Sequence, residues 1–291
     1  MNTIAIARFT FQEARRRRLL WLGIGLGLAF LALFGLGFYF VFDDIRRSVI
    51  MDFVGSDEQE AMLGLVANLF LMMGMFVVNF LVVLVAILTT VGAISGEISS
   101  HTIQAIVTKP LRRSEIILGK WLGHALMVTF YIIMLTGGII LIVKVISGHS
   151  PNHLAEGLGL YVLEGLVLMS VSILGGTRLS TMANGVLVFM IYGLAFVGGW
   201  VEQIASLPFV NSDTAVTIGS LAGKLLPSEV LWRRASHVMA PSISLGTDFE
   251  GPPPFLFTFG REPSSSVVLY ALVYIVVILV LAFVSFQRRD L

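Results

Sequence analysis

The sequence predicts an all-α membrane protein with six transmembrane helices. Of its 291 residues 56% are hydrophobic and only 13% charged, and the mean hydropathy is +0.91. Soluble domains carry about 25% charged residues, so lipid is the expected main solvent. Six apolar stretches approach the roughly 20 residues that a helix needs to cross a hydrocarbon core of about 30 Å. Their continuous runs, without period-two alternation, favour helices over a β-barrel.

The predicted spans are taken in chain order. The first begins directly after four arginines, and its 24 uncharged residues exceed the core of a typical secretory signal. No A-x-A cleavage pattern follows it, so we expect a retained span. The second lies within an uncharged run over 61–96, and the fourth is interrupted by Glu164. The six spans are expected at about 19–42, 65–96, 121–143, 157–177, 179–201 and 267–286.

The distribution of Lys and Arg predicts the orientation. With the N-terminus inside, the inner segments hold twelve Lys and Arg residues, against three in the two short outer segments. The long loop 202–266 is left out of this comparison, because the rule holds only for loops of up to about 60 residues. We therefore expect one membrane domain over 1–291 in the cell (inner) membrane, with both termini and the loop 97–120 in the cytoplasm. Segments 43–60 and 202–266 are then outer loops.

Several function classes lack their signatures. The net charge is only +1 and the basic residues flank apolar runs, so nucleic acid is not an expected partner. There is no cysteine, hence no disulfide framework and no thiolate nucleophile or metal site. No Walker A, G-x-S-x-G or H-E-x-x-H pattern is present, so we expect neither a catalytic residue nor ATP bound by this chain. His149 and His153 have a spacing that could chelate a metal on a helix, but Pro151 argues against a helix there.

The loop between the second and third spans carries the most information. It reads GEISSHTIQAIVTKPLRRSEIILGK from Gly96 to Lys120, with isoleucines spaced among charged residues. This mixture predicts short amphipathic helices at the membrane surface. Pro110 is expected to separate two such helices, and Ser114 to cap the second. Charge alone would also suit a basic loop lying on anionic lipid.

This loop resembles the cytoplasmic coupling region of ABC-2 type transporter permeases. The matching residues are Gly96, Glu97, Thr102, Ile103, Pro110, Arg113, Ile117, Leu118, Gly119 and Lys120. The resemblance implies the permease subunit of a bacterial ABC exporter, which forms a homodimer or heterodimer with another permease. It also implies a separate ABC ATPase subunit that binds ATP and Mg and grips the loop. The expected coupling residues are Glu97, Thr102, Ile103, Pro110, Arg112, Arg113 and Lys120.

Two polar residues within predicted spans are candidates for a substrate path. Burying a charged Glu164 at mid-membrane would cost on the order of 2.5–3.5 kcal/mol, which suggests a contact with a cation or a polar substrate. The alternative is a span that starts later, with Glu164 at the outer interface near Lys144. Asn79 could bond a neighbouring helix or a transported molecule. Two other functions remain open from the residues alone: an ion-coupled secondary transporter, and a membrane assembly or immunity factor.

The long outer loop predicts two further helices. Residues 228–239 place Leu231, Ala235 and Met239 on one face, with Arg233 and Arg234 opposite, so an amphipathic helix at the outer membrane surface is expected. Residues 213–226 suggest a shallow re-entrant helix. Glycine pairs at helix-packing spacing, Gly23 with Gly27 and Gly92 with Gly96, could lie between two permease copies or pack within one chain.

Overall fold

The computed structural model describes residues 3–16, 18–52, 56–99, 113–151, 153–206, 210, 212–239 and 263–289. Every regular element in these ranges is a helix, and six are long and apolar enough to cross a membrane, which confirms the predicted fold class. The six are α2 (Arg18–Asp52), α3 (Ser56–Thr90), α6 (Arg113–Ser147), α7 (Leu154–Gly176), α8 (Thr181–Ala205) and α11 (Ser266–Gln287). The shorter helices are α1 (Thr3–Arg16), α4 (Ser95–Ser99), α9 (Asp213–Leu225) and α10 (Ser228–Met239).

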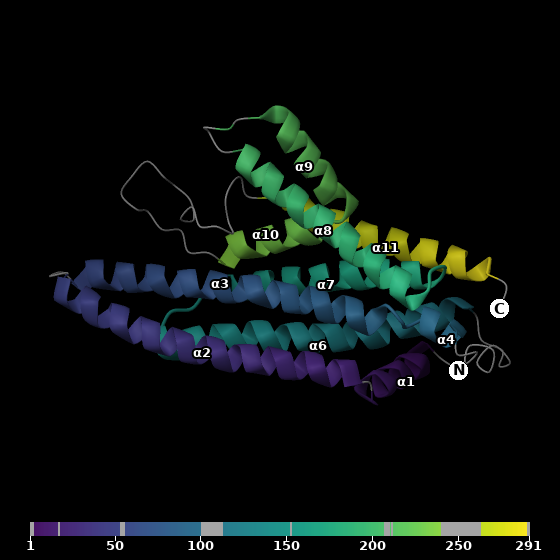
Figure 1. Cartoon of the computed structure of the whole chain (residues 1–291), viewed down its shortest axis with the longest axis horizontal. Helices are drawn as coiled ribbons and strands as arrows, with labels where there is room; N and C mark the ends of the chain where they lie inside the picture. The colour runs from purple at the N-terminus through teal and green to yellow at the C-terminus, as the bar shows by residue number, and fades with distance from the viewer. Residues whose placement is uncertain are drawn as a thin grey trace.

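Three helices are longer than the membrane requires. α2, α3 and α6 have 35 residues each, or about 52 Å at 1.5 Å per residue. The prediction of a loop over 43–60 was therefore wrong, since α2 continues to Asp52 and α3 already begins at Ser56. An ion pair of 2.5 Å between Arg47 and Asp43, one turn apart, supports the helix past its apolar run. The α2–α3 hairpin reaches beyond α6 and α7 at the end opposite both termini (Figure 1).

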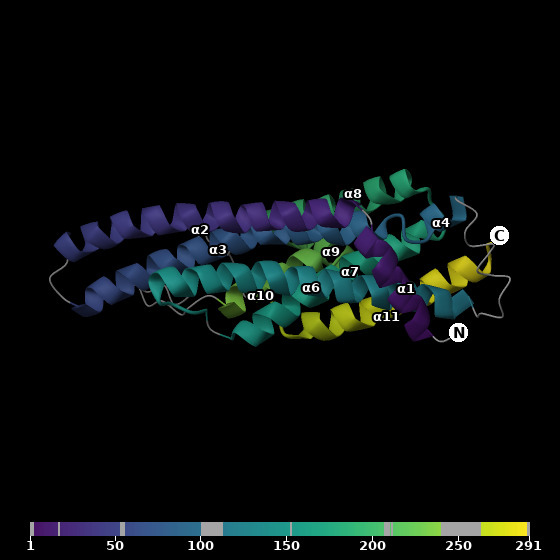
Figure 2. The same cartoon turned by 90° about the horizontal axis from the view of Figure 1, so that it is seen from below.

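The core lies between α3, α6 and α7, which run side by side in both views (Figures 1 and 2). Their facing side chains are fully buried, among them Met75, Val82, Ile132, Leu135 and Val167. α2, α8 and α11 lie at the periphery and expose large apolar side chains such as Leu33, Met190 and Leu272. Such exposure is expected of helices that face lipid or another membrane subunit.

Glycines allow α1 to lie directly on α6. Figure 2 shows α1 crossing α6 at a steep angle at the end where the chain begins. A Cβ at Gly119 would lie 2.5 Å from Ile6 Cβ, and one at Gly123 would lie 2.7 Å from Thr10 Cβ. The predicted pair Gly23 and Gly27 also packs within the chain, because Cβ atoms there would lie within 3 Å of side chains of α3 and α6.

The helix α10 has the predicted bounds but not the predicted surroundings. Its apolar face is buried, and so are Arg233 and Arg234, which the sequence placed on an exposed face. The expectation that the arginine face is exposed was wrong, because acidic residues of α7 and α8 pair with both arginines. α10 lies instead between α7 and the α8–α9 pair (Figure 1).

Close backbone contact also joins α8 and α9. α9 runs back along α8, and a Cβ at Gly198 would lie only 2.3 Å from Ala222 Cβ. A Cβ at Gly219 would lie 2.5 Å from the Gly198 carbonyl oxygen. The two helices can approach this closely only because both contact positions lack side chains.

We expect Gly198→Ala to separate α8 from α9 and to destabilise the chain by about 1–3 kcal/mol, since the neighbouring Ala222 Cβ has no rotamer to move. Gly193→Ala on the same helix is the matched control, because a Cβ there meets nothing within 4 Å. That control should be neutral or gain up to about 1 kcal/mol from helix propensity. Thermal unfolding in detergent measures both, and equal melting temperatures for the two variants would contradict the close packing.

Candidate functional site

The two predicted substrate-path residues lie in contact inside the bundle. Glu164 of α7 is fully buried, and Asn79 of α3 is only 2% exposed. With the Asn79 amide nitrogen facing the carboxylate, it donates to both Glu164 oxygens at 2.8 and 3.0 Å. The Tyr192 hydroxyl of α8 lies 3.4 Å from the other end of the amide, where it can donate to the amide oxygen. Three helices therefore meet at one buried carboxyl group.

The later start of α7, on which the alternative position of Glu164 depends, was wrong. α7 begins at Leu154, about three turns before Glu164, and the carboxyl group has no exposed surface. Lys144 is exposed on α6. Because α7 runs from Leu154 to Gly176, Glu164 lies near the middle of the helix.

A second carboxyl group reaches the same region from α10. Glu229 is 2% exposed and close enough to Glu164 for an electrostatic interaction. Its Oε2 lies 3.0 Å from Arg233 Nε, a charge contact without hydrogen-bond geometry. Gln203 donates to its Oε1 at 3.5 Å. A Cβ at Gly199 would lie 2.1 Å from the carboxyl carbon of Glu229, so this glycine makes room for the side chain against α8.

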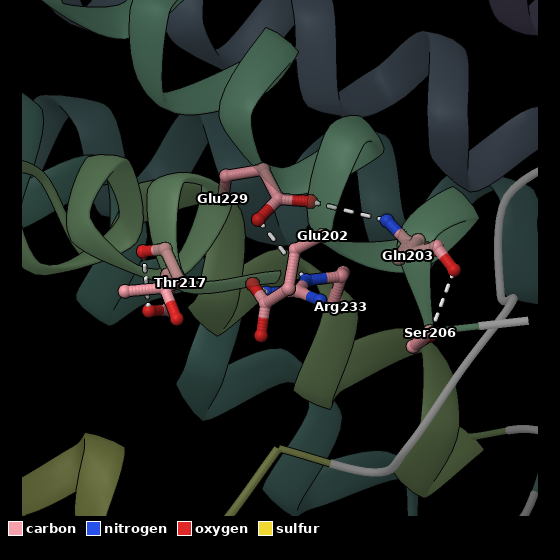
Figure 3. A network of polar contacts seen from close by, with 7 residues as sticks. Glu202, Gln203, Ser206, Thr217, Glu229 and Arg233 are labelled. Atoms are coloured by element: carbon pink, nitrogen blue, oxygen red, sulfur yellow. Dashed lines mark hydrogen bonds and ion pairs between the residues drawn. The ribbon is translucent and has the colours of Figure 1, made fainter. Parts of the chain in front are cut away.

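Arg233 joins two carboxylates. Its terminal nitrogen donates to Glu202 of α8 at 2.8 Å, while its Nε faces Glu229 (Figure 3). Arg234 makes a separate pair with Glu156 of α7 at 3.3 Å and donates to the Pro263 carbonyl at 2.6 Å. Breaking a buried pair such as Arg233 with Glu202 costs about 3–5 kcal/mol. Together the two arginines hold α10 in place between α7 and α8.

The surroundings change the acidity of Glu229. Burial raises its pKa to about 7, and Glu202 adds to the rise, whereas Arg233 opposes both. A single guanidinium shared between two carboxylates does not compensate fully for the loss of water. Glu229 therefore titrates near neutral pH.

A groove of about 990 Å³ opens beside this network, between α8, α9, α10 and α11. Glu202 and Arg233 form part of its polar wall. Its other side is largely apolar and includes Val267, Leu269 and Val273 of α11. Since Arg233 also contacts Glu229, the polar network links this groove to the acidic residues inside the bundle.

The predicted coupling region is anchored by a buried ion pair. Lys120 of α6 donates to Glu97 of α4, and both side chains are buried. The predicted second amphipathic helix was wrong, because α6 already begins at Arg113 and Ser114 lies within its first turn. Four further predicted coupling residues lie outside the described residues: Thr102, Ile103, Pro110 and Arg112.

The structure brings together residues that the sequence pattern did not select. Glu229, Arg233 and Tyr192 were not among the predicted site residues, although Glu229 and Arg233 stand one helical turn apart beside Trp232. Their partners come from other helices, which no local pattern reveals. His149 and His153 do not share a helix, because α7 starts only at Leu154. In the part of the chain that is described, no cluster of three His, Cys, Asp or Glu residues is arranged to hold a metal.

The raised pKa of Glu229 makes stability depend on pH. From its ordinary value of 4.5 to about 7, the folded chain retains a proton that the unfolded chain has lost. The contribution of this proton to the free energy of unfolding is complete below pH 4.5 and disappears as the pH rises through 7. The free energy of unfolding changes by an amount on the order of 3 kcal/mol over this range. We expect the melting temperature to fall between about pH 5 and about pH 8.

Glu229→Gln cannot titrate and should flatten this fall, whereas Glu60→Gln at an exposed position of α3 should keep the wild-type slope. Differential scanning fluorimetry in detergent across the pH range compares the three proteins. Parallel curves for wild type and Glu229→Gln would show that the carboxyl group is not perturbed by folding.

Comparison with known proteins identifies the family. The family model described as ABC-2 family transporter protein matches residues 4–217. The match runs from α1 into α9 and includes Asn79, Glu97, Lys120 and Glu164. A comparison with curated proteins found no match. A match over more than half of the length, together with six apolar helices, shows that the chain is a membrane component of the ABC-2 transporter family.

Proposed function

We propose that the chain is the permease subunit of an ABC exporter that is driven by ATP hydrolysis in a separate nucleotide-binding subunit. The family match supports the permease role. The observation that carries the coupling mechanism is the buried ion pair between Glu97 and Lys120. It joins the two helices, α4 and α6, between which the proposed coupling loop lies.

The positions of the two chain termini support a cytoplasmic position for that loop. Both termini, α4 and the start of α6 lie at the same end of the bundle (Figure 1). The excess of Lys and Arg in the inner segments favours this end as the cytoplasmic one in the inner membrane. The proposed contacts to the ATPase are then Glu97, Thr102, Ile103, Pro110, Arg112, Arg113 and Lys120.

The helix α6 provides a route from the loop to the buried carboxyl groups. It is one continuous helix of 35 residues, so a displacement at Arg113 moves the whole span. A Cβ at Gly165, next to Glu164, would lie 2.8 Å from Ile132 of α6. Closure of the ATPase on the loop would therefore shift α6 against α7 and change the surroundings of Glu164. Such rocking of packed helices is a common form of conformational switch.

ATP and Mg belong to the partner subunit in this proposal, and the chain itself contributes no catalytic residue. Glu164 and Asn79 are proposed as part of the substrate path. A second permease copy, identical or different, would complete the membrane unit. Its contact surface would come from the exposed apolar faces of the peripheral helices.

The coupling loop is tested by the double charge reversal Arg112→Glu/Arg113→Glu. We expect at least about fivefold less ATPase to co-purify with the tagged chain from native membranes, because like charges would replace complementary ones at the contact. The matched control is Arg46→Glu/Arg47→Glu, an arginine pair on the part of α2 at the other end of the bundle. Equal ATPase recovery in both double variants would count against the proposal, and so would ATP hydrolysis by the purified chain alone.

The buried pair is tested by exchanging its charges. Glu97→Lys or Lys120→Glu alone leaves two like charges in a buried position, so either should lower substrate-stimulated ATPase activity of the complex by about tenfold or more. The double variant Glu97→Lys/Lys120→Glu restores opposite charges and should recover much of the activity. A double variant no better than the worse single one would show that the pair does not act as a unit.

A further inference from the structure

The groove between α8, α9, α10 and α11 crosses the boundary between polar and apolar parts of the chain. Its wall includes Ser264 and Ser266, at the start of α11, and then Val267, Leu269 and Val273 within the apolar run of that helix. Leu269 and Val273 are 67% and 52% exposed, so the apolar part of the wall is accessible from outside the bundle. A molecule that fills the groove therefore needs a polar end and an apolar end.

Two tyrosines of α11 indicate that the groove lies at the membrane–water interface. Tyr270 lines the groove, and its hydroxyl donates to the carbonyl of Lys224 near the end of α9. Tyr274, one turn further along, donates to the Leu225 carbonyl at 2.9 Å. Tyrosine is enriched at this interface, because its ring lies among acyl chains while its hydroxyl reaches polar groups. The groove is thus expected where lipid headgroups meet their acyl chains.

The polar end of the groove carries one positive charge that no carboxylate compensates. Arg233 and Glu202 pair with each other at 2.8 Å, so their charges balance within the wall. Lys224 lines the groove too, but it forms no ion pair with any residue in the described ranges. The Ser264 hydroxyl accepts from Ser266 at 3.1 Å, which leaves its own hydrogen for an incoming acceptor. An ammonium group beside a hydroxyl donor favours an anionic headgroup.

We propose that the groove binds an anionic phospholipid, with its phosphate at Lys224 and one acyl chain along Leu269 and Val273. In the proposed orientation of the chain, this lipid comes from the outer leaflet. Lysine attracts anionic headgroups at a membrane surface, whereas a zwitterionic lipid would bring a second cation next to Lys224. The groove volume of about 990 Å³ is at the upper end of the range for small-molecule sites, so a phosphate ion alone would leave the apolar end empty.

Native mass spectrometry of the full chain in detergent tests the site, with phosphatidylglycerol and phosphatidylcholine of identical acyl chains titrated in parallel. We expect phosphatidylglycerol to bind at least about fivefold more tightly, and Lys224→Gln to lose this preference. The matched control is Lys144→Gln, which removes an exposed lysine from the last turn of α6 and should bind like wild type. Equal affinities for the two lipids, or equal losses in the two variants, would overturn the proposal.

Val273→Trp tests the acyl-chain end and leaves every charge in place. The larger side chain fills the apolar part of the groove, so we expect phosphatidylglycerol to bind about fivefold more weakly. Val276→Trp is the matched control, because Val276 is 60% exposed on the same helix and does not line the groove. Equal affinities of these two variants for phosphatidylglycerol would reject the acyl-chain position.

Glycerophosphoglycerol, the headgroup without acyl chains, distinguishes a lipid site from a site for free anions. At about a hundredfold molar excess it should displace little phosphatidylglycerol, because it cannot use the apolar end of the groove. Complete displacement would overturn the lipid assignment. The lipid titrations contain no ATPase, so their failure would leave the proposed transport function untouched, and loss of ATPase co-purification would not affect the lipid site.

Discussion

Pairing of charges that are removed from water is the constraint on which this structure depends. Among the described residues, the buried Lys120, Arg233 and Arg234 each pair with a carboxylate of another helix. Lys120 with Glu97 fixes α4 to α6, Arg233 connects α10 with α8, and Arg234 connects α10 with α7. A charge left alone in such a place costs several kcal/mol. The helices can therefore assemble only in arrangements that bring the partners together.

This constraint explains the position of α10. Its composition is that of a surface helix, with two arginines and a glutamate among apolar residues. It is buried nonetheless, because α7 and α8 supply carboxylates on both sides. Gly199 leaves space for the Glu229 side chain, and Gly157 lies against Met239 at the other end of the helix. Charge pairing selects the arrangement, and the missing side chains of glycine allow the helices to come close enough for it.

The long helices connect two regions of different chemistry. At one end lie α1, α4 and the start of α6, with both termini nearby (Figure 1). Toward the other, the buried carboxyl groups of Glu164 and Glu229 lie among α3, α7, α8 and α10. α6 contacts both regions and has no break along its 35 residues. A single rigid element between the proposed coupling loop and the proposed substrate site would make movement at one depend on movement at the other.

The fold class and the approximate spans follow from the sequence, because a run of apolar residues long enough to cross lipid leaves the backbone only the helix. The sequence also singled out Glu164, Asn79, Glu97 and Lys120, since polar groups in apolar runs or in a family pattern stand out locally. Which of these residues touch was decided by the tertiary structure alone. Asn79 and Glu164 are 85 residues apart in the sequence, and Glu202 and Arg233 are 31 residues apart. Contacts over such separations produce no periodic pattern in the sequence. The sequence pattern placed the α10 arginines in water for the same reason: an amphipathic helix shows which residues share a face, but not whether that face meets solvent or the carboxylates of another helix.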